Sequence, residues 1–264
     1  MLTAGVLRSW QVASVIFFAY ILGAAIARPR LPQRNRRQAS AAAGAGLVLA
    51  AASALVPLNP VLHGWLIPPA LLLLAYWTSG RLFVAPMVEV EETLMRLDRT
   101  LRVRSRAARA PRVVAEALEI SYAGVYPLIP VGLALFLLRV PDADPDRFWA
   151  VVLATDYVCF GVLPWVQTRP PRALEGADPW HSRFRAVNLR LLGAASIHVN
   201  TFPSGHAAEA LAVALLVSGA PLPYAGAMFI AAAAIAAGAV GGRYHYAADA
   251  VLGWGVALVV WAVL

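Results

Sequence analysis

The chain has 264 residues, of which 60% are hydrophobic and only 14% charged, and its mean hydropathy is +0.67. These values exclude an ordinary soluble domain and indicate a protein embedded in a membrane. The net charge of +8 comes from arginine, because the sequence contains no lysine. In a membrane protein this charge is a signal for topology and for attraction to anionic lipids, so nucleic acid is not an expected partner.

Long apolar segments predict about eight transmembrane helices. Residues 38–80 carry no charged side chain, and as one helix they would extend about 65 Å, twice the ~30 Å of a hydrocarbon core. The run must therefore fold back, and Pro57-Leu58-Asn59-Pro60 supplies the turn. The same reasoning divides the uncharged run 210–242 at residues 219–223. The predicted helices lie near residues 9–27, 40–57, 61–79, 117–138, 148–167, 205–219, 224–241 and 245–264.

The first apolar segment is interpreted as a true span. It is too long for a removable signal peptide, and no small-residue cleavage site precedes the arginine-rich stretch that follows it. The polar connection 81–112 alternates apolar side chains such as Val88 and Leu94 with charged ones such as Glu91 and Asp98. This pattern predicts an amphipathic segment in the membrane interface, beside the polar motifs described below. A solvated helix without a catalytic role fits the pattern equally well.

The arginines are distributed unevenly between the two sides that eight spans would create. Residues 28–37 contain five, residues 81–112 eight and residues 169–190 five, and Arg243 lies on the same side. The opposite side has three, Arg8, Arg139 and Arg147. The positive-inside rule therefore predicts that the arginine-rich side faces the cytoplasm.

The segment Pro203-Ser204-Gly205-His206 stands where a polar loop meets an apolar helix. The Ser204 hydroxyl, the Gly205 amide and the positive end of that helix together predict a site for an anion. His206, in the first turn, is placed to give a proton to an oxygen that leaves phosphorus.

A second polar motif, from Arg243 to Asp249, precedes the last apolar segment. His245 and Asp249 are four residues apart and share one helix face, so the carboxylate can accept a hydrogen bond from one imidazole nitrogen. The other nitrogen is then available as a nucleophile. Arg243 and Arg169 offer planar guanidinium groups to phosphate oxygens. Together the two motifs predict phosphoryl transfer on a lipid at the membrane surface.

These motifs resemble, residue for residue, the signatures of the phosphatidic acid phosphatase type 2 (PAP2) superfamily, which are K-x6-R-P, P-S-G-H and S-R-x5-H-x3-D. The second signature is complete in residues 203–206, and the third is matched at His245 and Asp249. Ala239 occupies the usual arginine position of the third signature, and Arg243 stands only two residues before His245. This R-Y-H-Y form is similar to the branch that includes inositol phosphorylceramide synthases.

The first signature is matched less well. Arg169-Pro170 is present, but Val162 occupies the lysine position, and Arg172, Arg183 or Arg185 would have to compensate for the missing charge. The resemblance implies that His245 forms a phosphohistidine and that His206 protonates the leaving group. No metal or cofactor is expected, because the nucleophile and its orienting carboxylate account for the histidines and aspartate of the motifs.

The resemblance also implies a fold. It predicts an all-α integral membrane protein with a six-helix PAP2-like core at residues 61–264, which includes the amphipathic segment 81–112. Residues 1–60 are then an N-terminal addition of two helices. The predicted location is a plasma membrane of the bacterial type. Many similar bacterial enzymes act on the outer face of that membrane, whereas the arginine count favours the cytoplasmic face.

The sequence leaves three functions open. The first is metal-independent hydrolysis of a lipid phosphate or diphosphate monoester. The second is transfer of a phosphoinositol or other phosphoalcohol headgroup to an alcohol instead of water, and the third is a transporter or scaffold without catalytic activity. The expected partners are the lipid phosphate substrate and membrane lipids, and the oligomeric state is left open. Asp156, in the middle of a predicted span, is interpreted as the partner in an interhelical hydrogen bond because about 20 Å of helix separates it from Arg169.

Overall fold

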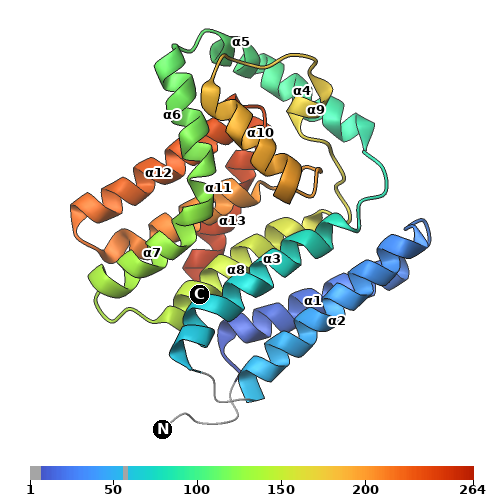
Figure 1. Cartoon of the computed structure of the whole chain (residues 1–264), viewed down its shortest axis with the longest axis vertical. Coiled ribbons are helices and arrows are strands. Elements are labelled where there is room, and N and C mark those ends of the chain that lie inside the picture. The colour runs from blue at the N-terminus through green and yellow to red at the C-terminus, as the bar shows by residue number, and fades with distance from the viewer. Residues whose placement is uncertain (1–6, 56–58) are drawn as a thin grey trace.

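A computed structural model describes residues 7–55 and 59–264, which form helices and connecting loops without a β-strand (Figure 1). The predicted all-helical fold is therefore confirmed for this part of the chain. An isolated antiparallel bridge joins Thr168 to Asn200. Pro57 and Leu58 of the predicted turn lie outside the described residues.

In chain order, the helices are α1 (Ser9–Ala27), α2 (Gln33–Leu55), a π-helical turn η1 (Leu62–Leu66), α3 (Ile67–Gly80), α4 (Val88–Thr100), α5 (Val103–Ala108), α6 (Arg112–Ala123), α7 (Val125–Arg139), α8 (Pro145–Val162), α9 (Pro171–Leu174), α10 (Arg183–Ala195), α11 (Gly205–Leu216), a 3-10 turn η2 (Val217–Gly219), α12 (Leu222–Gly241) and α13 (Ala247–Val263).

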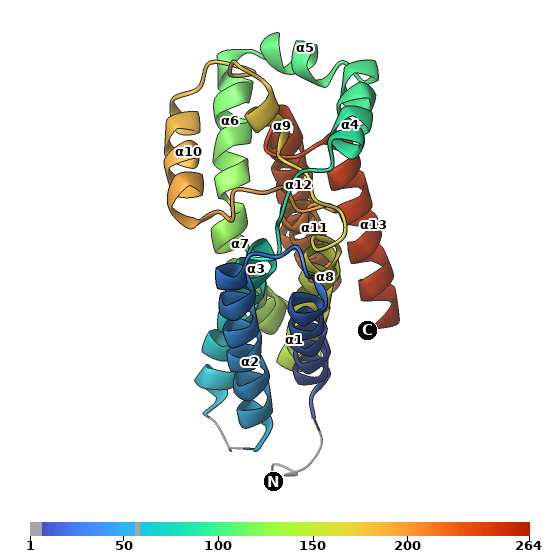
Figure 2. The ribbon, with the colours of Figure 1, turned by 90° about the vertical axis from the view of Figure 1, so that its right-hand side faces the viewer.

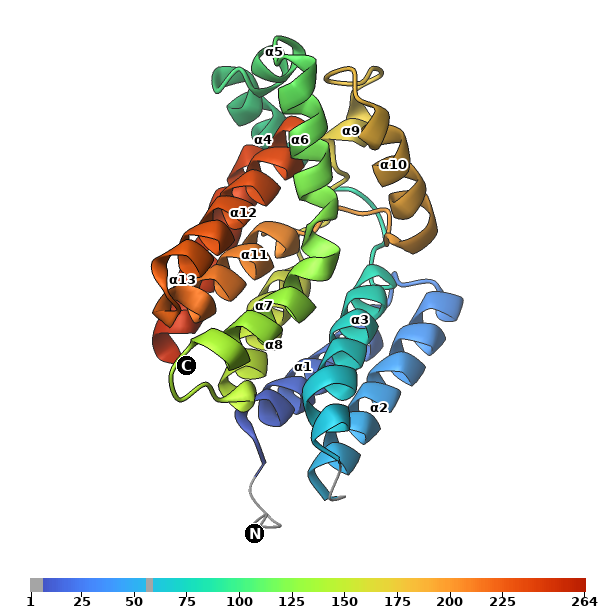
Figure 3. The same cartoon turned by 60° about the vertical axis from the view of Figure 1, so that its left-hand side comes forward.

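Helix α11 lies inside the bundle, where it packs against α7, α8, α12 and α13 (Figure 3). Its side chains are mostly small, and Ala207, Ala208, Ala210, Ala212 and Ala214 are all buried. Short side chains let the neighbouring helices approach closely. On the other side of α8, α1 packs against both α2 and α8.

The bundle has two chemically different ends. At one end Arg8 forms an ion pair of 2.6 Å with Asp146, so α1 and α8 begin at the same level. Toward the other end the Tyr20 hydroxyl of α1 donates to the carbonyl of Gly161, in the last turn of α8, at 2.6 Å. Helices α4, α5, α9 and α10 gather beyond that second end (Figure 2) and form a polar cap. The loops that lead to the two histidine motifs reach the same end.

Three helices, α1, α2 and α12, are long and apolar enough to cross a membrane. A fourth span results if α6 and α7 are counted as one bent unit. The predicted number of about eight spans is therefore not confirmed. Helices α11 and α13 are apolar but shorter, and α8 contains Asp146, Arg147 and Asp156 within its 18 residues.

The span predicted at 117–138 is interrupted. Helices α6 and α7 meet at Gly124 at an angle of 64°. Helix α6 is bound to the polar cap, because its Glu116 and Glu119 accept hydrogen bonds from residues at and near α10. Helix α7 alone continues along the bundle (Figure 3).

The predicted amphipathic segment 81–112 contains α4, α5 and the start of α6. The buried face of α4 presents Glu91, Leu94 and Asp98, which recur at helical spacing. Its outer face exposes Val88 and Leu97. The two buried carboxylates, Glu91 and Asp98, contact the loops that carry the predicted site.

Candidate active site

The Pro-Ser-Gly-His segment forms the start of α11. Ser204 is the N-cap, and its hydroxyl accepts a hydrogen bond from the Ala207 amide at 3.3 Å. Gly205 lies against α8, and a side chain there would come within 3.0 Å of the Phe160 ring and 3.2 Å of Asp156 Oδ1. The glycine therefore allows the first turn of α11 to pack closely on α8.

The two histidines of the motifs come together at this end of the bundle. His206 is in the first turn of α11, and its ring centroid is 5.8 Å from that of His245. Tyr122 of α6 stacks on His206 at 5.4 Å, and Tyr126 of α7 meets it edge-on at 6.3 Å. Residues far apart in the sequence thus place two imidazoles side by side.

Asp249 lies behind His245, but the two do not share a helix face as expected, because His245 precedes Tyr246, the N-cap of α13. The distance from His245 Nδ1 to Asp249 Oδ2 is 3.4 Å. The same oxygen accepts hydrogen bonds from Asn200 Nδ2 at 2.9 Å and from the Tyr246 amide at 3.0 Å. Asp249 is fully buried, and His245 Nε2 makes no hydrogen bond with any described residue. This second ring nitrogen is therefore free to react.

Arg172 is the arginine that the structure brings to the histidines. Its side chain lines a small cavity together with His206 and His245, and its guanidinium lies 5.4 Å from the centre of the Tyr244 ring. Arg172 Nη1 also donates to the Tyr244 carbonyl at 3.5 Å. Burial and the positive charge of Arg172 lower the pKa of His245, which lies on the loop before α13, so that its imidazole is neutral near pH 7.

Arg169 and Arg243 lie elsewhere, each bound to carboxylates. Arg169 forms a bidentate pair with Glu91 of α4, with distances of 2.7 and 3.1 Å. Arg243 is buried and reaches Asp98 at 2.6 Å and Glu175 at 2.9 Å. The structure therefore places neither guanidinium between the histidines, which differs from the arrangement that the sequence suggested.

A local chain reversal separates Arg243 from His245. Arg243 has a φ of 62°, in the left-handed region that side-chain-bearing residues rarely adopt. As a result, the Arg243 side chain contacts α4, whereas the His245 side chain, two residues later, faces His206 of α11. The Ala247 amide, at the start of α13, donates to the second oxygen of Asp98 at 3.0 Å. Helix α4 thus holds the His245 loop from both sides.

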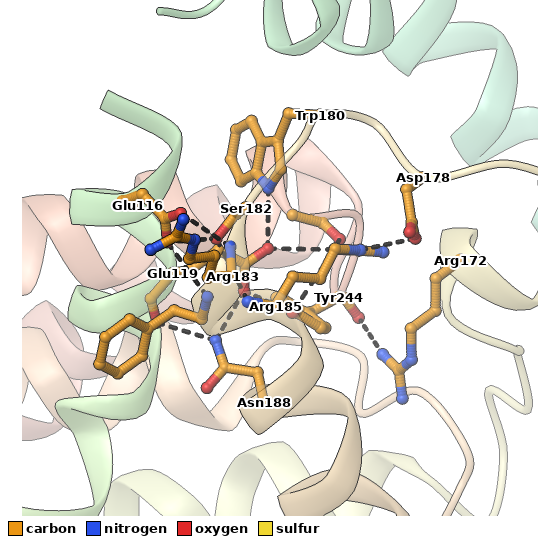
Figure 4. A network of polar contacts seen from close by, with 12 residues as sticks. Glu116, Glu119, Arg172, Asp178, Trp180, Ser182, Arg183, Arg185, Asn188 and Tyr244 are labelled. Carbon is orange, nitrogen blue, oxygen red and sulfur yellow. Dashed lines mark hydrogen bonds and ion pairs between the residues drawn. The ribbon is translucent and has the colours of Figure 1, made fainter. Parts of the chain in front are cut away.

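Arg185 takes part in a buried network around Glu119 (Figure 4). Its guanidinium contacts Glu119 at 3.1 Å and Asp178 at 2.6 Å. Glu119 also accepts hydrogen bonds from Trp180, Asn188 and the hydroxyl of Tyr244. Because Tyr244 precedes His245, this network stabilises the position of the second motif.

Arg183 is exposed at the start of α10, and its backbone amide donates to Glu116 at 2.7 Å. Neither Arg183 nor Arg185 lines the small cavity between the histidines. Of the three arginines considered as replacements for the missing lysine, Arg172 alone reaches that cavity in the part of the chain that is described.

Two further residues near the site were missed by sequence reasoning. Asn200, which binds Asp249, occupies an irregular loop and belongs to no motif, so the sequence offered no signal for it. Glu209 lies one turn after His206 and lines a second cavity. A charged residue within an apolar helix is itself a signal of function, and Glu209 could have been found in this way.

Asp156 also lines the second cavity. Neither of its carboxylate oxygens has a hydrogen-bond partner among the described residues, so the interhelical hydrogen bond expected for it is not present. Within residues 7–55 and 59–264, no group of three or more His, Cys, Asp or Glu residues is arranged to hold a metal ion.

The paired histidines lie within a segment that matches a known family. Residues 86–263, two-thirds of the chain, match the family model of the PAP2 superfamily. The chain belongs to the PAP2 superfamily. The matched range contains His206, His245, Asp249 and Arg172, and also α4, whose carboxylates hold the loops of the site. No curated protein and no solved structure matches this PAP2 protein significantly.

Proposed function

We propose that this PAP2 protein hydrolyses a lipid phosphate or diphosphate monoester through a phosphohistidine at His245. The observation that carries the proposal is the pairing of the His206 and His245 rings, 5.8 Å apart, beside the guanidinium of Arg172. Superfamily membership supports phosphoryl transfer as the reaction class. The apolar helices α1, α2 and α12 support a lipid in the membrane as the substrate.

In the first step, His245 Nε2 attacks phosphorus and the bond from phosphorus to the lipid oxygen breaks. Asp249 Oδ2 accepts the hydrogen bond from Nδ1–H and stabilises the charge that develops on the ring. The negative charge of the bound phosphate favours the imidazolium form of His206, which donates its proton to the departing lipid oxygen. Arg172 and the amides at the start of α11 bind the phosphoryl oxygens.

In the second step, a water molecule attacks the phosphohistidine. His206, now neutral, accepts a proton from that water as the bond from phosphorus to nitrogen breaks. Inorganic phosphate leaves, and both histidines return to their starting protonation states. None of these steps uses a metal ion.

Arg169 and Arg243 then have positioning roles in place of direct phosphate contacts. Their carboxylate partners Glu91, Asp98 and Glu175 neutralise them and connect α4 and α9 to the two loops of the site. Arg183 is exposed and Arg185 is engaged with Glu119 and Asp178, so phosphate binding is assigned to Arg172, Ser204 and Gly205.

We also propose the placement of the chain in the cell. It is an integral protein of a plasma membrane of the bacterial type, with the site at its cytoplasmic face. Residues 1–60 are a two-helix addition to a catalytic membrane domain at 61–264.

Hydrolysis is tested with purified protein and radiolabelled lipid phosphates and diphosphates in detergent, with EDTA present. The wild type should release labelled inorganic phosphate, and His245→Ala and His206→Ala should each retain less than about a tenth of that rate. His181→Ala, a change of an exposed histidine on the same cap, is the control and should retain full activity.

A lipid phosphotransferase is distinguished in the same assay by adding candidate alcohols. If the main product were lipid-linked and little labelled phosphate were released, the function would be transfer to an alcohol and not hydrolysis. A strict requirement for added Mg²⁺ or Zn²⁺ would contradict the metal-independent mechanism.

A further inference from the structure

A second cavity of about 180 Å³ opens beside the histidines. Its walls are largely apolar and include Leu72 and Trp77 of α3 and Ile129 of α7. His206 lines both this cavity and the small one that holds Arg172. An apolar chamber that adjoins the reacting groups is suited to the part of a lipid next to its phosphate.

Two carboxyl groups interrupt the apolar lining. Asp156 comes from α8 and is 1% exposed, yet both of its oxygens lack a hydrogen-bond partner among the described residues. Glu209 comes from α11, is half-buried, and makes no hydrogen bond or ion pair within the described part of the chain. Burial of such groups without partners is costly, so a ligand that supplies donors would be bound favourably.

The position of the two carboxyls relative to His206 is defined by the helix. Glu209 follows His206 by three residues, a rise of about 4.5 Å along α11. Asp156 Oδ1 would lie 3.2 Å from a side chain at position 205, so it faces the turn that carries His206. Both carboxyls therefore lie within about one helical turn of the group proposed to protonate the leaving oxygen.

We infer that Asp156 and Glu209 form a subsite for a hydrogen-bond donor, a free hydroxyl or an N–H, on the lipid backbone next to the phosphoester. A carboxyl oxygen accepts a hydrogen bond from such a group in either protonation state of the acid, whereas a methylene in the same place offers it no partner. The separation from His206 corresponds to a donor a few bonds from the phosphoester oxygen. The inference rests on the proposed function and specifies its substrate as a lipid phosphate with an unesterified donor beside the phosphate.

The test compares two lipids that differ in one hydroxyl group. The first is 1-acylglycerol 3-phosphate, with its free 2-hydroxyl, and the second is the 2-deoxy analogue with the same acyl chain. For the wild type, kcat/KM for phosphate release should be about tenfold higher with the hydroxyl lipid, the effect of one hydrogen bond. Asp156→Leu and Glu209→Leu, which remove the acceptor oxygens, should each reduce this ratio toward one, with most of the change in KM.

Asp146→Leu is the matched control. It makes the same chemical change on the same helix, ten residues away at the other end of the bundle, and it should retain the wild-type ratio. If Asp156→Leu does not fold, Glu209→Leu provides the comparison. A wild-type ratio near one, or a ratio unchanged in the variants, would overturn the subsite.

Binding separates this inference from the proposed hydrolysis. Dissociation constants for both lipids are measured by quenching of tryptophan fluorescence, since Trp77 lines the cavity. Tighter binding of the hydroxyl lipid that is lost in Asp156→Leu, without phosphate release by the wild type, would uphold the subsite and refute hydrolysis. Phosphate release from both lipids without a preference in binding or rate would uphold hydrolysis and refute the subsite.

Discussion

The charge that faces the two imidazoles is supplied by Arg172. Its guanidinium lines the same small cavity as His206 and His245, and it rests on the ring of Tyr244 at 5.4 Å. Arg172→Ala should therefore lower kcat/KM by about 100-fold, the usual cost of removing one donor to a developing negative charge. Steady-state phosphate release measures this effect, and Arg172→Lys should restore part of the activity because it returns the charge without the planar fork.

Arg183→Ala provides the matched control for that change. Arg183 is exposed on α10 and does not line the cavity, so its removal should leave kcat/KM within about twofold of the wild type. Equal losses in the two variants would mean that general attraction of anionic lipid, rather than contact at the site, explains the effect of Arg172.

Sequence reasoning at the scale of single residues succeeded where the chemistry is local. The position of His206 in a first helical turn follows from its local sequence, whereas His245 precedes α13 and reaches Asp249 from the loop. The partners of the arginines depend on tertiary structure. Arg243 was expected at the phosphate, but Asp98 and Glu175 come from distant segments, and the sequence gives no indication that they would bind it.

At the scale of elements, α4 controls the position of the His245 loop. Asp98 accepts from Arg243 Nη1 at 2.6 Å and from the Ala247 amide at 3.0 Å, so one buried carboxylate holds the chain on both sides of His245. Asp98→Asn should lower kcat by about tenfold through misplacement of the nucleophile, while KM changes less. The thermal midpoint should also fall, because Arg243 loses one of its two charged partners.

Glu92→Gln on the outer face of α4 is the control for Asp98→Asn. Glu92 is exposed and has no ion pair among the described residues, so neither kcat nor the thermal midpoint should change. A wild-type kcat for Asp98→Asn would show that α4 is not needed to position the His245 loop.

Helix α13 touches the Pro-Ser-Gly-His loop directly. A side chain at Gly253 would lie 2.5 Å from the Ser204 carbonyl oxygen, which is closer than any real contact, so α13 would have to move. Gly253→Ala should therefore lower both the thermal midpoint and the activity, because the Ser204 loop and Asp249 would be displaced.

Gly255→Ala, two residues further along the same helix, meets nothing within 4 Å. It should retain activity and raise stability slightly, since alanine favours a helix by about 1 kcal/mol relative to glycine. Thermal unfolding and phosphate release of the two variants, measured together, test the packing. If Gly253→Ala and Gly255→Ala had similar thermal midpoints and similar rates of phosphate release, the close approach of α13 to the Ser204 loop would be contradicted.

Hydropathy located each helical region but not its limits. The segment 117–138 is apolar enough to predict one span, yet the chain bends at Gly124 because Glu116 and Glu119 find partners on and near α10. The bend depends on contacts between α6 and a helix about 60 residues away in sequence, which a local apolar pattern does not encode.

For the whole molecule, the arginine-rich loops and the candidate site lie at the same end of the bundle. This arrangement agrees with the uneven arginine distribution and predicts a cytoplasmic site. Cysteines introduced at Gln33 and Asp144, both exposed and at opposite ends, report the orientation in a Cys159→Ala background. In intact cells an impermeant thiol reagent should label Asp144→Cys and not Gln33→Cys.

Disruption of the membrane should expose both positions, and this provides the control for reactivity. Labelling of Gln33→Cys in intact cells would place the site on the outer face. The assignment of the histidines would be unaffected, because it depends on the geometry of the site and not on its orientation.

The central claim is that His245 carries the phosphoryl group during turnover. The direct measurement is rapid mixing of the enzyme with lipid phosphate labelled at phosphorus, followed by quenching at alkaline pH and peptide mapping by mass spectrometry. The label should be found on the imidazole of His245 in the wild type and should be absent in His245→Ala. Label on another residue, or phosphate release by a His245→Ala protein at the wild-type rate, would contradict the account.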